Sequence, residues 1–333
     1  MRSTCSVYID TGYLLASAAT RATGTSLRSG VHVDYAKLVA SLVDTAETRS
    51  KLPLLRVHWY DSARNGVPDL QQERIGELPK VKLRLGRFGV NGEQKGVDLR
   101  IGLDLVTHAR NGTSDVFFLV PGDDDLTEAV DEAQLHGVQV VLLAVPTLMG
   151  KAHAVSRHLI RAADELDVLD GAALDAAVMK VERPPFAAPR SELAPLSRTE
   201  AKPTPTRQDP VRTPLDLATR ISTPKTPRAA SVLAYSSTTG SAGHALPGYD
   251  LPDVHDKDQD DAIDEVVVRV ITSFRESATP EELAELQRAR PSILRDVDRA
   301  LLLDASDAMN LYDLDEDVRH RLRTRFWEKH DEL

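Results

Sequence analysis

The feature that most constrains the fold is an alternation of short apolar β-type runs with segments of helical periodicity over residues 1–180. Chains that alternate in this way build a mainly parallel sheet covered by helices on both faces. The runs predict strands at residues 7–9, 54–60, 81–88, 116–120 and 138–145, with a short sixth near 166–169. Helices are expected at residues 35–46, 97–109, 126–136 and 153–163. We therefore expect a Rossmann-like α/β domain over residues 1–180.

The chain changes character after this domain. Residues 181–257 are rich in Pro, Ser and Thr and hold most of the 19 prolines. Such a composition buries too little apolar surface to offset the entropy of ordering, so it predicts a disordered linker. Helical periodicity then returns, with Ile263, Val266 and Val270 on one stripe, and Thr279-Pro280-Glu281-Glu282 is typical of a helix start. We expect a small helical C-terminal module over residues 258–333.

Composition narrows the choice of partners and compartment. The 333 residues include 41 Lys+Arg and 51 Asp+Glu, a net charge of -10, so a nucleic-acid partner would need a local basic patch or bound cations. The single cysteine, Cys5, excludes an internal disulfide and fits a reducing compartment. No apolar run reaches the roughly 18 residues of a membrane span, so we expect a cytoplasmic protein without a membrane partner. The final residues, HDEL, spell a retention address that has little weight without an import signal.

Acidic residues gather where the expected strands end. Since the carboxyl ends of parallel strands meet at one edge of a sheet, one edge should carry Asp10, Asp61, Asp98, Asp123, Asp124 and Asp125. Each of them, taken alone, is also explained as a helix cap or as a charge that favours a helix N-terminus. Together they repel one another, and a hard divalent cation removes that penalty. The pattern predicts a Mg²⁺ or Mn²⁺ site.

The same residues resemble the NYN domains, which belong to the PIN-like nucleases. The resemblance covers roughly residues 5–170 and rests on Tyr8-Ile9-Asp10, on KGVDLRIGLD at residues 95–104, and on PGDDDL at 121–126 followed by GVQV at 137–140. It implies a metal-dependent ribonuclease whose catalytic and metal-binding residues are Asp10, Asp98, Asp123 and Asp125. Asp104 and Asp124 are secondary candidates; Asp104 lies about 120° around a helix from Asp98.

Two positions depart from the family pattern. Tyr13 stands three residues after Asp10, where the family commonly has Asn, and Pro121 replaces the usual Ser before Gly-Asp. Tyr13 supplies no amide, which favours the alternative of a non-catalytic RNA- or protein-binding module on the same fold. A phosphatase with an aspartyl nucleophile would need a second Asp at Gly12, so we discount it.

Basic residues offer RNA two candidate surfaces. Lys80, Lys82 and Arg84 alternate with apolar residues, and the positive stretch continues through Arg87, Lys95 and Arg100. We expect these six to contact RNA phosphates, although lysines that guard an edge strand against aggregation explain the alternation equally well. The C-terminal row of Arg319, Arg321, Arg323 and Arg325 is better explained by a salt-bridged helix face than by RNA. A homodimer and a protein partner of the C-terminal module remain open.

Overall fold

The structure, a computed structural model, describes residues 3–88, 94–121, 124–181, 254–309, 311 and 314–332. The chain forms two units, one made of Met1–Pro185 with Pro252–Leu333 and the other of Phe186–Leu251. The first unit contains all of the helices and strands described below. Nearly all of the expected linker, residues 182–253, lies outside the described residues, as does Asp123.

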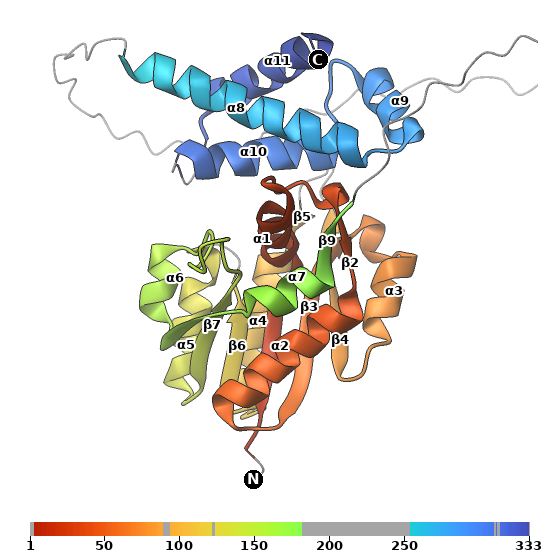
Figure 1. The fold of residues 1–333 in the computed structure, drawn as a ribbon. Helices are drawn as coiled ribbons and strands as arrows, with labels where there is room; N and C mark the ends of the chain where they lie inside the picture. Colours follow the sequence, from red (N-terminus) through yellow and green to blue (C-terminus); the bar gives the residue numbers. More distant parts are fainter. Residues whose placement is uncertain are drawn as a thin grey trace, which may run out of the picture. The chain divides into compact units, whose positions relative to one another are not determined.

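The expected parallel sheet is confirmed. A seven-stranded sheet has the order β5-β4-β3-β1-β6-β7-β8 (Figure 1). All neighbours in it are parallel except β5, which runs antiparallel to β4. Its strands are β1 (Cys5–Asp10), β3 (Leu54–Ala63), β4 (Val81–Phe88), β5 (Gln94–Lys95), β6 (Val116–Val120), β7 (Gln139–Ala144) and β8 (Glu165–Val168). A separate antiparallel pair joins β2 (Val31–Val33) to β9 (Val178–Lys180).

The order of the parallel strands reverses beside the central strand β1. The chain passes from β1 through β3 to β4 on one side, and then crosses to β6, β7 and β8 on the other. In open α/β sheets, ligands bind outside the carboxyl ends of the strands at such a reversal. The strand-ending Asp10 of β1 therefore occupies the position where a binding site is expected.

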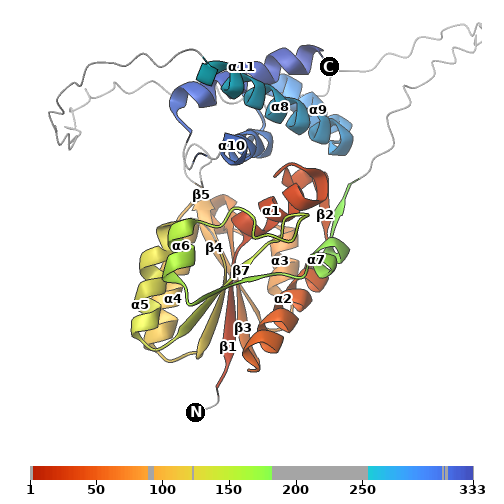
Figure 2. The ribbon, with the colours of Figure 1, turned by 60° about the vertical axis from the view of Figure 1, so that its left-hand side comes forward.

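Helices cover both faces of the sheet (Figure 2). One face packs against α1 (Thr11–Thr23), α2 (Tyr35–Ser50), α3 (Leu70–Gly76) and α7 (Gly171–Ala177). The other packs against α4 (Val97–Arg110), α5 (Thr127–Leu135) and α6 (Arg157–Ala162). Since alternate residues of a strand point to opposite faces, Val7 and Ile9 lie in the first core and Tyr8 in the second. Short 3-10 turns are η1 (Arg28–Gly30), η2 (Arg64–Gly66) and η3 (Asp124–Leu126).

The structure contains helices that the sequence pattern did not predict, namely α1, α3 and α7. Helix α1 is rich in Ala, Thr and Ser, and Thr11 and Ser17 are buried beside Leu14 and Leu15, so polar residue types hide its buried face in the sequence. The side chain of Asp10 forms its N-cap. Helix α6 begins at Arg157 and not at residue 153, because the Ser156 hydroxyl accepts hydrogen bonds from the first backbone N–H groups of the helix.

The C-terminal segment is helical as expected, with α8 (Val254–Ser277), α9 (Pro280–Ala289), α10 (Arg295–Met309) and α11 (Glu316–Glu332). Their core is built on the predicted stripe of α8, on Leu301 and on Phe326, all fully buried. The fully buried Leu27, from the segment after α1, belongs to the same cluster. The Ser26 backbone N–H donates to Asp304 Oδ1 at 2.9 Å. The C-terminal helices therefore share their core with the N-terminal part of the chain.

Among the described residues, no helix is long and apolar enough to span a bilayer.

Candidate active site

Asp10 is the buried centre of the site. It ends β1 and caps α1, and its Oδ1 accepts a hydrogen bond from the Gly12 backbone N–H at 2.7 Å. Only 9% of the residue is exposed. Burial raises the pKa of Asp10 to about 7, and the charge of Asp98 adds to the rise, while Gly12 N–H, Arg28 and Arg299 oppose it. The unfavourable effects of burial and of Asp98 on ionised Asp10 thus outweigh the favourable effects of Gly12 N–H, Arg28 and Arg299.

Asp98 is brought close to Asp10 by the start of α4. The helix begins after Gly96, whose φ of +81° is the left-handed conformation that glycine adopts at little cost. Burial raises the pKa of Asp98, and the negative charge of Asp125 adds to that effect. Carboxylates from β1, α4 and η3 therefore interact electrostatically at the edge where the strand order reverses.

The acidic run after β6 is described only in part, because Asp123 lies outside the described residues. Asp124 Oδ2 lies 3.2 Å from His158 Nδ1, whereas its Oδ1 is buried and lacks a hydrogen-bond partner in the part of the chain that the structure describes. Asp125 is exposed. No group of three or more His, Cys, Asp or Glu side chains within the described ranges is arranged to hold a metal ion. That observation does not include Asp123, which lies outside the described ranges.

Two further acidic residues have partners of their own. Asp104 accepts a hydrogen bond from the Tyr60 hydroxyl at 2.8 Å and forms an ion pair with Arg84 at 3.0 Å. Asp61 accepts from Gln72 Nε2 at 2.9 Å. The structure thus gives Asp104 and Asp61 local structural partners, and it brings Asp98 to Asp10.

Tyr13, the departure from the family pattern, ties α1 to the loop after β7. Its hydroxyl donates to the His153 carbonyl at 2.6 Å and accepts from the Val145 backbone N–H at 3.1 Å. Burial raises the pKa of Tyr13. Both functions of the hydroxyl are therefore engaged by backbone, and the phenol remains a neutral structural group.

The basic stretch at β4 shows the expected alternation. Val81 and Leu83 pack on the core that contains Trp59, whereas Arg84 reaches Asp104 of α4 on the opposite face. Lys82 is exposed. Lys80 lies 3.8 Å from Glu47, and Arg100 is exposed on α4. For Arg87 and Lys95 the structure describes the backbone alone, where the two residues pair between β4 and β5.

Sequence reasoning missed two arginines beside Asp10. Arg28 Nη2 donates to the Gly12 carbonyl at 2.8 Å. A Cβ placed on Gly12 would lie 2.8 Å from Asp10 Oδ1 and 3.1 Å from Arg299 Nη2. Burial lowers the pKa of Arg299 to about 10, and the nearby charge of Arg28 adds to that effect, while the charges of Asp10 and Asp296 oppose it. Gly12 has no side chain and so leaves room for those of Asp10, Arg28 and Arg299. It was the one residue in the local sequence that could have indicated this close approach.

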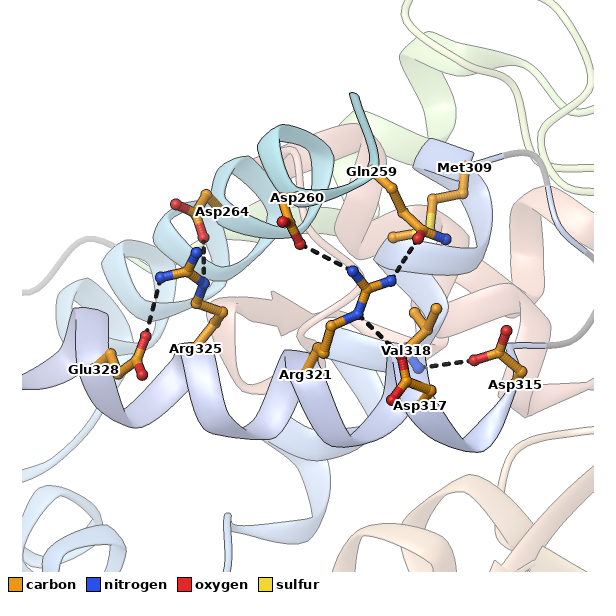
Figure 3. Close-up of polar contacts among 10 residues, drawn as sticks. All are labelled: Gln259, Asp260, Asp264, Met309, Asp315, Asp317, Val318, Arg321, Arg325 and Glu328. Carbon is orange, nitrogen blue, oxygen red and sulfur yellow. Dashed lines mark hydrogen bonds and ion pairs between the residues drawn. The ribbon is translucent and has the colours of Figure 1, made fainter. Parts of the chain in front are cut away.

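The arginines of α11 form the salt-bridged helix face that the charge pattern favoured (Figure 3). Arg321 pairs with Asp260 of α8 at 3.0 Å and also contacts Gln259. Arg325 lies 3.4 Å from Asp264 of α8 and 3.1 Å from Glu328. The pairs with Asp260 and Asp264 join α11 to α8, so they account for these two charges without a nucleic acid.

The reversal of strand order and the acidic cluster beside it lie in the part of the chain that matches a family of PIN-like, nuclease-type domains. Residues 4–170 match the model of the NYN domain family, which is about half of the chain. The protein therefore belongs to the NYN domain family, and the resemblance seen in the sequence is confirmed.

A relative is known from Sinorhizobium fredii (strain NBRC 101917 / NGR234), the "Uncharacterized protein y4oD". It is 36% identical over 98 residues, which are 29% of this chain and 46% of the relative. The match thus spans less than half of the relative's length. No solved structure gives a significant match.

Proposed function

We propose that this protein is a metal-dependent ribonuclease that hydrolyses RNA phosphodiester bonds at the Asp10 edge of the sheet. The observation that carries the proposal is the convergence of Asp10, Asp98 and Asp125 from β1, α4 and η3. Burial and mutual repulsion raise the pKa of both Asp10 and Asp98. A site with this excess of negative charge favours a bound cation.

The donor set suits Mg²⁺ or Mn²⁺, since both ions prefer carboxylate oxygens and water. Asp10, Asp98, Asp125 and Asp123 would hold the ion, and the unpartnered Oδ1 of Asp124 is a further oxygen nearby in the sequence. Such an ion supplies Lewis acidity and a lowered pKa for bound water. The Gly12 backbone N–H fixes the orientation of the Asp10 carboxylate through its bond to Oδ1.

Positive groups on β4 and α4 would offset the repulsion between RNA and a chain of charge -10. Lys82 and Arg100 are exposed for contact with the RNA backbone. Arg84 is engaged by Asp104, so its contact with RNA would compete with that ion pair. The single, buried Cys5 suits a reducing compartment, and we place the activity in the cytoplasm.

The decisive experiment measures cleavage of mixed single-stranded and structured RNA with Mn²⁺, Mg²⁺ or a chelator. Wild-type protein should cleave only with metal. Asp10→Asn and Asp98→Asn should each lower the rate by at least about 100-fold, since removing one group that stabilises developing charge typically costs that much. Asp131→Asn is the matched control, because Asp131 is exposed on α5. Variants that still cleave at the wild-type rate would contradict the assignment.

A second readout separates metal binding from catalysis. In chelator, Asp10→Asn should unfold at the same temperature as wild type or higher, because Asn still caps α1 and the repulsion with Asp98 is gone. Mn²⁺ should raise the unfolding temperature of wild type and leave that of the variant unchanged. An equal rise in both proteins would place the ion away from Asp10.

A non-catalytic RNA- or protein-binding module is the second candidate. It is favoured by Tyr13, whose hydroxyl is held between Val145 and His153 and offers no amide at the position where the family commonly has Asn. Metal-dependent stabilisation without cleavage of any RNA would support this candidate over the nuclease.

A further inference from the structure

We propose that Arg28 and Arg299 form a clamp for a phosphodiester group of RNA beside Asp10, so that helix α10 completes the active site. The identity of the ligand rests on the proposed function. The existence of an anion site rests on the geometry alone, and the two are tested separately below.

Arg28 is held in place at the start of η1. Its Nη2 donates to the carbonyl of Gly12, at the first turn of α1. This bond uses one of the five N–H groups of the guanidinium and leaves the others for a second acceptor. Arg28 is therefore fixed at Gly12, next to Asp10, and has N–H groups left to donate to a ligand.

Arg299 approaches the same spot from α10. A Cβ on Gly12 would lie 3.1 Å from Arg299 Nη2 and 3.6 Å from Arg28 Nη2. Among the described residues, Arg299 forms no direct hydrogen bond or ion pair. The charges of Asp10 and Asp296 favour the ionised form of this guanidinium, whereas burial and the neighbouring cation of Arg28 oppose it. An anion between the two arginines would offset both unfavourable effects.

Arg299 has two alternative roles: it binds an external anion together with Arg28, or it acts as an internal plug that neutralises the acidic site from within the protein. If Arg299 served to neutralise Asp10, the two would be expected to form a direct ion pair, as Arg323 does with Asp298 at 2.7 Å. Arg299 instead forms no direct ion pair with Asp10: both side chains and that of Arg28 meet around Gly12, and the charge of Arg299 opposes the rise in the pKa of Asp10. Guanidinium groups recognise phosphate by two parallel N–H bonds, which suits a pair of arginines left with free donors.

Buried contacts, and not surface charges, bring the two arginines together. Arg28 follows directly on Leu27, which is fully buried in the core of the C-terminal helices. Ser26 N–H donates to Asp304 of α10, the helix that also carries Arg299. Thr25 Oγ1 donates to Ser273 Oγ of α8 at 3.4 Å. The clamp is therefore part of a packed joint, which gives its two halves a defined position.

Space for a nucleoside adjoins the clamp. A cavity of about 870 Å³ is lined by Arg28 together with His32, Tyr35, Gln71, Arg74 and Asp296. Its volume falls within the roughly 300–1,000 Å³ of small-molecule sites. A phosphate held by Arg28 could therefore carry its nucleoside in this cavity, with the neighbouring scissile bond at the acidic edge.

The test measures binding without cleavage. A fluorescently labelled single-stranded RNA is titrated with the full-length protein in chelator, by fluorescence anisotropy over a range of NaCl concentrations. Arg299→Gln and Arg28→Gln should each weaken binding about 10-fold at low salt. Each should also reduce the slope of log K against log salt by about 0.7, the value for one lost phosphate contact on a single strand. Arg299→Lys should fall between, because it keeps the charge and loses the planar fork.

Arg288→Gln is the matched control, since Arg288 is exposed on α9 and, among the described residues, its guanidinium donates only to the Ala284 carbonyl of the same helix. Circular dichroism checks the fold of every variant, and either of the two Gln variants suffices for the test. Wild-type affinity and salt slope in Arg299→Gln and Arg28→Gln would overturn the clamp, as would tighter binding, which an internal plug would produce.

The same samples, assayed with Mn²⁺, keep this proposal apart from the nuclease assignment. RNA binding that depends on Arg299 without any cleavage would leave the clamp standing and remove the ribonuclease. Cleavage that depends on Asp10, with binding indifferent to both arginines, would do the reverse.

Discussion

Individual buried residues in the sheet favour their neutral forms. His58 of β3 is 3% exposed, and its ring stacks on Tyr8 at 4.8 Å and lies 4.7 Å from His108. Its Nδ1 has no hydrogen-bond partner among the residues that the structure describes. Burial lowers the pKa of His58 to about 3, and the charges of His108, Arg84, Arg56 and Lys82 act in the same direction. His58 is therefore an uncharged packing residue at neutral pH.

The position of His58 predicts sensitivity to acid. The unfolded chain takes up a proton near pH 6.5, whereas the folded chain does so only near pH 3. The stabilisation is thus complete above about pH 6.5 and is lost as the pH falls from there, at up to about 1.4 kcal/mol per pH unit. Urea unfolding at pH 7, 6 and 5 should show a shallower decline for His58→Phe than for wild type. Parallel declines would contradict the assignment.

Helix starts in this chain are encoded locally. Asp34 caps α2 by accepting from Lys37 N–H, and Asp69 forms a capping box with Gln72 at α3. At α9 the predicted box is present: Thr279 accepts from Glu282 N–H, and the Glu282 carboxylate accepts from Thr279 N–H. These signals span four residues, so they can be found in the sequence without knowledge of the sheet.

The capping box at the start of α9 should make a measurable contribution to the free energy of unfolding. Thr279→Ala removes the side chain that caps the helix and should lower the free energy of unfolding by about 1 kcal/mol, within a range of about 0.5–2 kcal/mol. Thr279→Ser keeps the hydroxyl and should lie close to wild type. The comparison requires chemical denaturation of the three proteins under one condition. Equal losses for Ala and Ser would show that the methyl group, and not the cap, stabilises this helix start.

At the scale of the whole molecule, the N-terminal domain and the C-terminal helices share buried structure. Leu27 lies fully inside the C-terminal core, and the buried Asp304 accepts a bond from Ser26, 278 residues away in the chain. Burial raises the pKa of Asp304, and its bonds to Ser26 oppose the rise. A joint of this kind couples the unfolding of both parts.

The two tryptophans allow this coupling to be measured by fluorescence, because each reports on one part: Trp59 lies in β3 and Trp327 in α11. Single-tryptophan proteins, Trp59→Phe and Trp327→Phe, should each show one fluorescence transition. Leu27→Ala should shift both to lower denaturant, by about 2–5 kcal/mol of unfolding free energy. A shift of the Trp327 transition alone would show that the C-terminal helices unfold independently.

The sequence by itself determined the local elements and the edge at which the acidic residues lie. Strands β4 and β6 have the predicted bounds, and the Thr279 cap was identified from four residues. The acidic edge followed from a general rule, because all parallel strands end on the same side. Helix α1 escaped prediction because its buried face includes Thr11 and Ser17, although its cap, Asp10, was recognised as important for another reason.

The tertiary structure decided which charges meet. It paired Asp104 with Arg84, engaged the Tyr13 hydroxyl with backbone, and brought Arg28 and Arg299 to Gly12 beside Asp10. Periodicity and capping operate within one or two turns of chain, so they are written in neighbouring residues. The approach of α10 to the first turn of α1 depends on how Leu27 packs among distant helices, and side chains so far apart in sequence carry no local mark of their contact.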